Sequence, residues 1–118
     1  MTEAKRGWIG VDLDGTLAEY NTGEFHPEVI GKPIPRMVER VKRWLAEGKD
    51  VRIFTARVSE LSPDWRSQEL LIRAWCMKNL GRALVVTCSK DYLMTELWDD
   101  RAIQVVPNEG RRADGKAG

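Results

Sequence analysis

Residues 8–20 read Trp8-Ile-Gly-Val-Asp-Leu-Asp-Gly-Thr-Leu-Ala-Glu-Tyr20, and the rest of the chain is interpreted outward from them. The apolar run 8–13 is typical of a buried parallel strand, and two acids, Asp12 and Asp14, arrive where that strand should end. Side chains two residues apart on an extended chain project to the same side, so these carboxylates should converge. Gly15 then permits a sharp exit from the strand. Ligands of open α/β sheets bind at such strand ends.

Two carboxylates held close together repel unless one is protonated or a cation lies between them, and Mg²⁺ is the usual cation for oxygen ligands. The stretch Asp12-Leu-Asp-Gly-Thr16 resembles DxDGT, the first motif of the haloacid dehalogenase (HAD) superfamily of phosphotransferases. The resemblance implies that Asp12 attacks phosphorus and that Asp14 is the general acid and base. We place Gly15 and Thr16 with the substrate-binding residues. The alternative is an acidic turn that caps a helix through Asp14 or Thr16.

The length of 118 residues predicts one domain, which we place at 1–107, followed by a flexible tail at 108–118. With 19 Lys and Arg against 18 Asp and Glu, nothing favours bulk attraction to nucleic acid or membranes. Cys76 and Cys88 are too few for a disulfide framework, and with one histidine they show no zinc-ligand spacing. No run is apolar enough for a membrane span. We expect a cytoplasmic protein with reduced cysteines.

A second β-favouring run, 51–54, ends in Thr55-Ala-Arg57. A hydroxyl with a following backbone N–H can bind a phosphoryl oxygen, and a guanidinium suits phosphate geometry. The run resembles the second HAD motif, and Thr-x-Arg is also similar to the Ser-Gly-Arg of the phosphatase domain of phage polynucleotide kinase. We therefore count Thr55, Ala56 and Arg57 as substrate-binding residues, and Thr55 also as catalytic. The structural alternative is a strand end followed by a surface arginine.

Two further motifs follow predicted strands. Lys90 comes shortly after the strand 83–87, and a lysine there can neutralise a phosphoryl oxygen, as the third HAD motif does. Alone, such a lysine is usually solvent-exposed. Asp99 and Asp100 resemble the fourth motif in its Asp-Asp form, in which the second acid tends to contact the metal. Adjacent residues on an extended strand point to opposite sides, so one acid should face the metal and the other support it.

The expected fold is a three-layer, Rossmann-like α/β domain with a five-stranded parallel sheet in the order 5-4-1-2-3. Helices are predicted from 33 to 48 and from 62 to 80, with Ser62 as the N-cap and 103–106 as the fifth strand. The loop 18–32 is too short for a cap domain, so the site should be open. Between Lys90 and Asp99 there is room only for a turn or a short helix, which leaves the path to the fourth strand undecided.

Together these motifs predict a Mg²⁺-dependent phosphatase acting through an aspartyl-phosphate at Asp12. As the resemblance implies, Mg²⁺ would be held by Asp12, the main-chain carbonyl of Asp14 and the Asp99/Asp100 pair. The substrate would be a phosphorylated small molecule or nucleic-acid end, and the analogy with polynucleotide kinase slightly favours nucleotides or polynucleotide ends. The sequence is compatible with a homo-oligomer. The alternatives are a receiver-like phospho-acceptor and a non-catalytic binding module of the same fold. In receiver domains the adjacent acidic pair comes first, which argues against that alternative.

Overall fold

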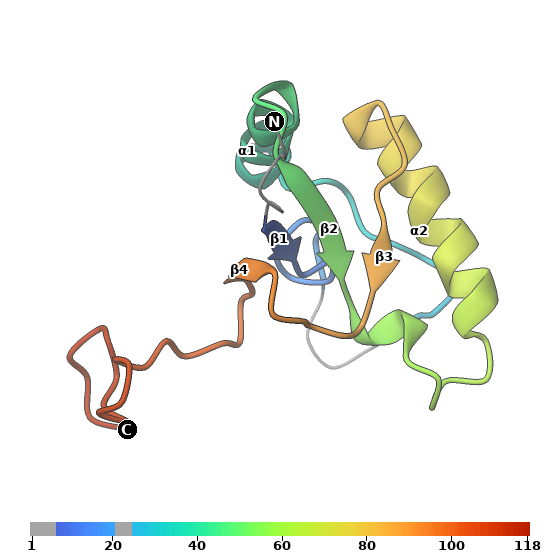
Figure 1. Ribbon diagram of the computed structural model, residues 1–118. Coiled ribbons are helices and arrows are strands. Elements are labelled where there is room, and N and C mark those ends of the chain that lie inside the picture. Colours follow the sequence, from blue (N-terminus) through green and yellow to red (C-terminus); the bar gives the residue numbers. More distant parts are fainter. Residues whose placement is uncertain (1–6, 21–24) are drawn as a thin grey trace.

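The computed structural model describes residues 7–20 and 25–118, which build an α/β protein around a parallel sheet (Figure 1). The strands are β1 (Trp8–Val11), β2 (Asp50–Phe54), β3 (Val86–Thr87) and β4 (Met94–Trp98). Their order across the sheet is β3-β2-β1-β4, and all neighbours are parallel. The strand that precedes Asp12 therefore lies inside the sheet.

All four residues of β1 are buried, as the apolar run predicts for an interior strand. Val11 pairs with Ile53 of β2 on one side and with Trp98 of β4 on the other. Backbone pairing continues just beyond the strands, where the N–H of Asp12 donates to the carbonyl of Trp98 at 2.9 Å. The carboxyl ends of β1, β2 and β4 thus lie on the same side of the sheet, here called its carboxyl edge. The residues that follow these strands are therefore brought close together.

The helices are α1 (Pro35–Ala46) and α2 (Trp65–Leu80), with the short 3₁₀ helix η1 (Ala56–Val58) after β2. Residues at helical spacing face the core, namely Met37, Val38, Val41 and Trp44 of α1 and Ile72, Cys76 and Leu80 of α2. Gly81 ends α2 in the left-handed conformation. The predicted Ser62 cap was wrong, because Asp64 occupies the N-cap position and makes no side-chain capping bond.

Both α-helices lie on the same face of the sheet. They contact one another, and each connects neighbouring strands in the series β1, β2, β3. Right-handed crossovers that advance in one direction place their helices on one face. Within residues 7–20 and 25–118 no further α-helix covers the opposite face. The three-layer expectation was therefore wrong for the described chain, which has one sheet and one layer of helices.

The expected fifth strand does not join the sheet. Residues 103–106 pair with no strand of the described sheet, and only four residues separate residue 103 from the end of β4. The segment instead leaves the body of the molecule (Figure 1), where Val105 forms an isolated antiparallel bridge with Arg112. The sheet therefore has four strands, and the order 5-4-1-2-3 was wrong in strand number. Within the predicted tail 108–118, residues 108–115 form turns that are hydrogen-bonded to residues 104–106.

The connection from β3 to β4 contains no helix and is held by Asp91. The Asp91 carboxylate accepts the indole N–H of Trp8 at 2.9 Å and the backbone N–H of Leu93 at 2.8 Å. The N–H of Trp8 in turn donates to the carbonyl of Leu93 at 2.8 Å. The turn that the short spacing allowed is thus realised, and it delivers the chain to the free side of β1.

Candidate functional site

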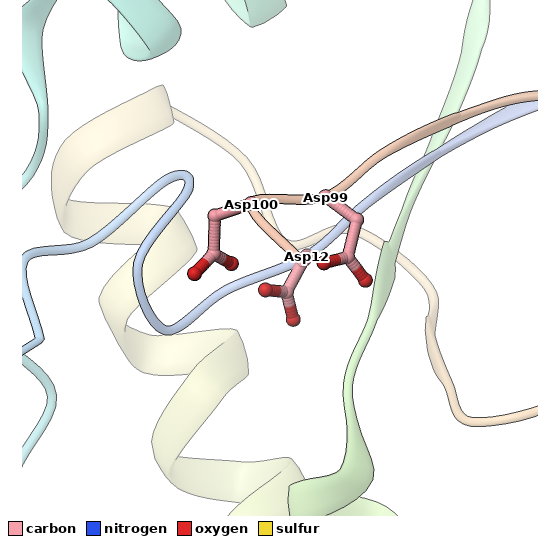
Figure 2. Close-up of side chains that lie close together, drawn as sticks. All are labelled: Asp12, Asp99 and Asp100. Atoms are coloured by element: carbon pink, nitrogen blue, oxygen red, sulfur yellow. The ribbon is translucent and has the colours of Figure 1, made fainter. Parts of the chain in front are cut away.

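Three carboxylates meet at the carboxyl edge of the sheet. Asp12 follows β1, and Asp99 and Asp100 follow β4 directly. One oxygen from each carboxylate lies within 4.8 Å of the others, and Figure 2 shows the three side chains pointing the same way. Three carboxylate oxygens are the donor set that a hard divalent cation such as Mg²⁺ prefers. This group of residues, here called the acidic triad, fits the predicted metal.

Both acids after β4 belong to the triad, so the expectation that one would point away was wrong. That expectation assumed an extended backbone, whereas β4 ends at Trp98 and the chain then turns. The Asp99 carboxylate accepts the backbone N–H of Arg101 at 2.7 Å, which stabilises this turn. The turn brings both side chains to the same side.

The triad perturbs the protonation of its members. Partial burial, the hydrogen bond with Asp100 and the charges of Asp99 and Asp100 raise the pKa of Asp12 to about 7. Partial burial also acts to raise the pKa of Asp100, but its hydrogen bonds with Asp12 and the hydroxyl of Thr16 outweigh this and lower that pKa. The burial and the neighbouring acids thus disfavour the charged form of Asp12. A bound cation would offset this repulsion and favour the ionised carboxylate.

Gly15 and Thr16 contact the triad. The Thr16 hydroxyl lies 3.1 Å from Oδ1 of Asp100 and 3.5 Å from Oδ2 of Asp12, and it accepts the backbone N–H of Asp100 at 3.1 Å. Gly15 has φ +91°, and a Cβ there would lie 2.7 Å from Oδ2 of Asp100. These two residues, predicted to bind substrate, contact Asp100, and Thr16 holds its backbone and side chain by hydrogen bonds.

Replacing Gly15 by alanine is expected to destabilise the protein and weaken Mg²⁺ binding, because the new methyl group displaces the Asp100 carboxylate. The left-handed backbone alone costs about 1–2 kcal/mol. Gly48→Ala is the matched control, since Gly48 has φ +82° and a Cβ there would have no neighbour within 4 Å. Urea unfolding with and without Mg²⁺ measures both terms. Equal losses for the two variants, with equal stabilisation by Mg²⁺, would contradict the role of Gly15.

Asp14 lies outside the triad and is bound by Arg57. The guanidinium Nε and Nη2 of Arg57 donate to Oδ2 and Oδ1 of Asp14, both at 2.8 Å. The extended geometry that predicted convergence of the two acids ends at Val11, after which the chain turns and Asp14 forms an isolated bridge with Ala18. The structure thus gives the two acids of the first motif different surroundings.

The buried Arg57 uses every N–H of its guanidinium on protein acceptors. Besides the two bonds to Asp14, Nη1 donates to the carbonyl of Pro27 at 3.1 Å and to Oε1 of Gln68 at 2.9 Å, and Nη2 donates to the carbonyl of Val29 at 2.9 Å. The five donors of an arginine are thereby occupied. In this conformation Arg57 has no donor left for a phosphoryl group, which the sequence interpretation assigned to it.

Thr55 is buried at the carboxyl end of β2, as predicted. Its hydroxyl accepts the backbone N–H of Arg57 at 3.2 Å and so caps η1, while its own N–H donates to Thr87 at 2.9 Å. Thr55 and Ala56 both line a cavity of about 650 Å³ that also includes Asp12, Asp14 and Asp99. The first and second motifs and one acid of the fourth therefore share one cavity.

Lys90 does not line this cavity. It lines a separate hollow beside β4 with residues 91, 92 and 94–97. The reason is the short connection after β3: Cys88 still lines the cavity, but the chain then runs to the start of β1, where Asp91 binds Trp8. The prediction that the Lys90 side chain joins the acids is thus not met in this conformation.

Several residues that line the cavity were not assigned to the site from the sequence. Arg101, next to the acidic pair, lines the cavity and offers a cation there; its place in Asp-Asp-Arg was the available signal. Gln68 lies on a helix face that sequence spacing assigns to the core, and no local pattern marks it as part of a site. Aromatic side chains contribute the apolar part of the wall: Tyr20, Phe25 and Phe54.

One solved structure shares the fold. It is that of a conserved protein from Bacteroides thetaiotaomicron, with a TM-score of 0.54 and 22% sequence identity over 88% of this chain and 84% of that chain. No protein-family model and no curated protein matches the sequence. The similarity shows the fold alone.

Proposed function

We propose that the protein is a Mg²⁺-dependent phosphomonoesterase of the HAD type that acts through an aspartyl-phosphate at Asp12. The observation that carries the proposal is the separation of two carboxylates in one cavity. Asp12 lies in the acidic triad, whereas Asp14 is held apart by Arg57. A nucleophile beside a cation and a separate proton-transfer group are the requirements of this chemistry.

The acidic triad would hold the metal, with Asp12, Asp99 and Asp100 as its side-chain ligands. When bound, Mg²⁺ supplies positive charge that offsets repulsion between a phosphate dianion and a carboxylate. The arrangement of the three acids supports this assignment, because partial burial and the neighbouring carboxylates raise the pKa of Asp12 to about 7, and a cation would favour its charged form. A protonated carboxyl is a poor nucleophile.

The reaction proceeds in two displacements at phosphorus. A carboxylate oxygen of Asp12 would form a bond to phosphorus as the bond to the leaving oxygen breaks, and Asp14, which must take up a proton before this step, would give that proton to the leaving oxygen. Asp14 then takes a proton from water, whose oxygen attacks phosphorus and releases phosphate and the Asp12 carboxylate. Thr55 would bind a phosphoryl oxygen through its hydroxyl. Lys90 would contribute only after a rearrangement of residues 88–93.

The cavity indicates the class of substrate. A volume of about 650 Å³ is in the range of small-molecule sites. Aromatic side chains and the hydroxyls of Ser59 and Ser62 suit a leaving group with a flat ring and polar substituents. Nucleotides and polynucleotide ends combine these features, and we propose them as the first substrates to test.

No described helix has the length and apolarity to cross a membrane.

The proposal is tested by phosphate release from p-nitrophenyl phosphate, nucleotides, 3′- and 5′-phosphorylated oligonucleotides and sugar phosphates, each with Mg²⁺ and with EDTA. We expect turnover with Mg²⁺ only and the highest kcat/KM on nucleotides or oligonucleotide ends. Stable phosphorylation by acetyl phosphate without turnover would instead support a receiver-like role. If the folded protein binds Mg²⁺ but neither hydrolyses a phosphoester nor becomes phosphorylated, the result would support the non-catalytic binding role.

A further inference from the structure

The segment from Phe25 to Gly31 contributes two residues to the wall of the cavity and is bound by Arg57, which also holds Asp14. The carbonyls of Pro27 and Val29 accept from Arg57, and the Arg57 guanidinium lies 4.8 Å from the centroid of the Phe25 ring. Phe25 and Pro27 line the cavity. This segment, here called the cover loop, therefore forms part of the wall that a substrate meets.

Gln68 completes the attachment from α2. Its Nε2 donates to the carbonyl of Pro27 at 2.6 Å, and its Oε1 accepts from Nη1 of Arg57 at 2.9 Å. Gln68 is 5% exposed; its bond with Arg57 is buried and its bond with Pro27 is partly buried. Buried amide groups without partners are costly, which makes one arrangement of Gln68, Arg57 and Pro27 strongly preferred.

The base of the cover loop is also closed by backbone bonds. The N–H of Glu19 donates to Lys32 and the N–H of Ile34 donates to Leu17, both at 2.8 Å, while Trp75 donates its indole N–H to Gly31 at 3.0 Å. The loop is thus anchored at its base independently of Arg57. Loss of the Arg57 contacts would release its tip without unfolding its base.

We propose that Arg57 and Gln68 are positioning residues that couple the cover loop to the carboxylate of Asp14. The bidentate pair sets the plane of Asp14, and the remaining three donors of Arg57 bind Gln68 and the loop. A change in the loop must therefore move Asp14, and a change in Asp14 must loosen the loop. The catalytic part of this inference rests on the proposed function, because it assigns proton transfer to Asp14.

Two substitutions separate the parts of this network. Gln68→Glu keeps an acceptor for Arg57 and removes the donor to Pro27, whereas Arg57→Lys keeps the charge and removes the bidentate fork. Both are expected to lower kcat about 10-fold or more, as displacement of a general acid or base does, while the Mg²⁺ concentration for half-maximal activity stays unchanged. Arg66→Lys, an exposed change on the same helix, is the matched control.

The decisive measurement repeats both substitutions in an Asp14→Asn background, with p-nitrophenyl phosphate because its leaving group departs without a proton. Residues that act through Asp14 should cause no further loss there, since effects within one functional unit are non-additive. Equal losses in both backgrounds, or a parallel loss of Mg²⁺ affinity, would show a general structural defect and overturn the proposal. Thermal unfolding identifies any variant that fails to fold.

Hydrogen exchange provides a readout that does not need turnover. Asp14→Asn should speed amide exchange in residues 25–31 several-fold relative to residues 35–46 of α1, because the freed Arg57 holds the loop less tightly. Unchanged exchange in that variant would overturn the coupling even if the enzyme is active. No turnover by the wild type, with the expected exchange pattern, would contradict the proposed phosphatase function and leave the coupling itself supported.

Discussion

Replacing Asp12 by asparagine is expected to abolish phosphate release while stabilising the folded protein near neutral pH in metal-free buffer. The amide cannot form the bond to phosphorus, so kcat should fall by at least about 10³-fold, into the range seen when nucleophiles are removed. The two effects have opposite signs because the carboxylate that the reaction needs is held in surroundings that disfavour its charge. The matched control is Asp50→Asn, because Asp50 begins β2 and so lies at the amino ends of the strands, away from the acidic triad.

The stability effect follows from the pKa of Asp12, which rises from 3.8 to about 7 on folding. Between these values the folded protein binds more protons than the unfolded chain, so the free energy of unfolding falls as the pH rises. The stabilising contribution is fully present below the unfolded pKa and is lost above about pH 7. Because Asp12 is only half-buried, we expect about 2 kcal/mol rather than the roughly 4 kcal/mol of a fully buried group.

Urea unfolding of the wild type and Asp12→Asn between pH 4 and 8 in EDTA measures this contribution. The wild type should lose stability relative to the variant across that range, and Mg²⁺ should restore it only in the wild type. A variant that is less stable than the wild type at every pH would contradict the assigned surroundings of Asp12. Retained, metal-dependent turnover would instead contradict its role as nucleophile.

Asp100→Asn is expected to weaken Mg²⁺ binding more than Asp99→Asn, and the double substitution should weaken it at least about 100-fold. Asp100 is fixed by Thr16 and approaches Gly15, and its lowered pKa keeps it charged beside Asp12. One carboxylate oxygen of Asp99 already accepts a hydrogen bond from the backbone N–H of Arg101. Removing the more fixed charge should therefore cost more affinity.

Isothermal titration with Mg²⁺ at pH 8, where Asp12 is largely ionised, measures these affinities. Asp50→Asn again serves as control, because its exposed pair with Arg52 contributes little to stability. A larger loss for Asp99→Asn would reverse the assignment of the principal ligand. Unchanged affinity in the double variant would exclude the acidic triad as the metal site.

The sequence determined the strand ends well, since apolar runs bounded by polar residues are a local signal. Asp12 and Thr55 each follow such a run, whereas the strand before Asp99 also contains Thr95 and Glu96. The parallel pairing of β1 with β2 and β4 brings all three residues to the same end of the strands. For this reason the central strand and its neighbouring acids could be predicted without coordinates. The fifth strand was wrong because a β-favouring composition does not by itself ensure that a segment pairs with the sheet.

Only the tertiary structure decided which of these residues act together. The turn after Val11 directs Asp14 to Arg57 and away from Asp12, and the turn after Trp98 brings Asp99 and Asp100 to one side. Lys90 was misplaced because its position depends on the path between two edge strands. Side-chain direction in turns, and partners as distant in sequence as Gln68 and Pro27, are set by packing of the whole chain, which no local pattern encodes.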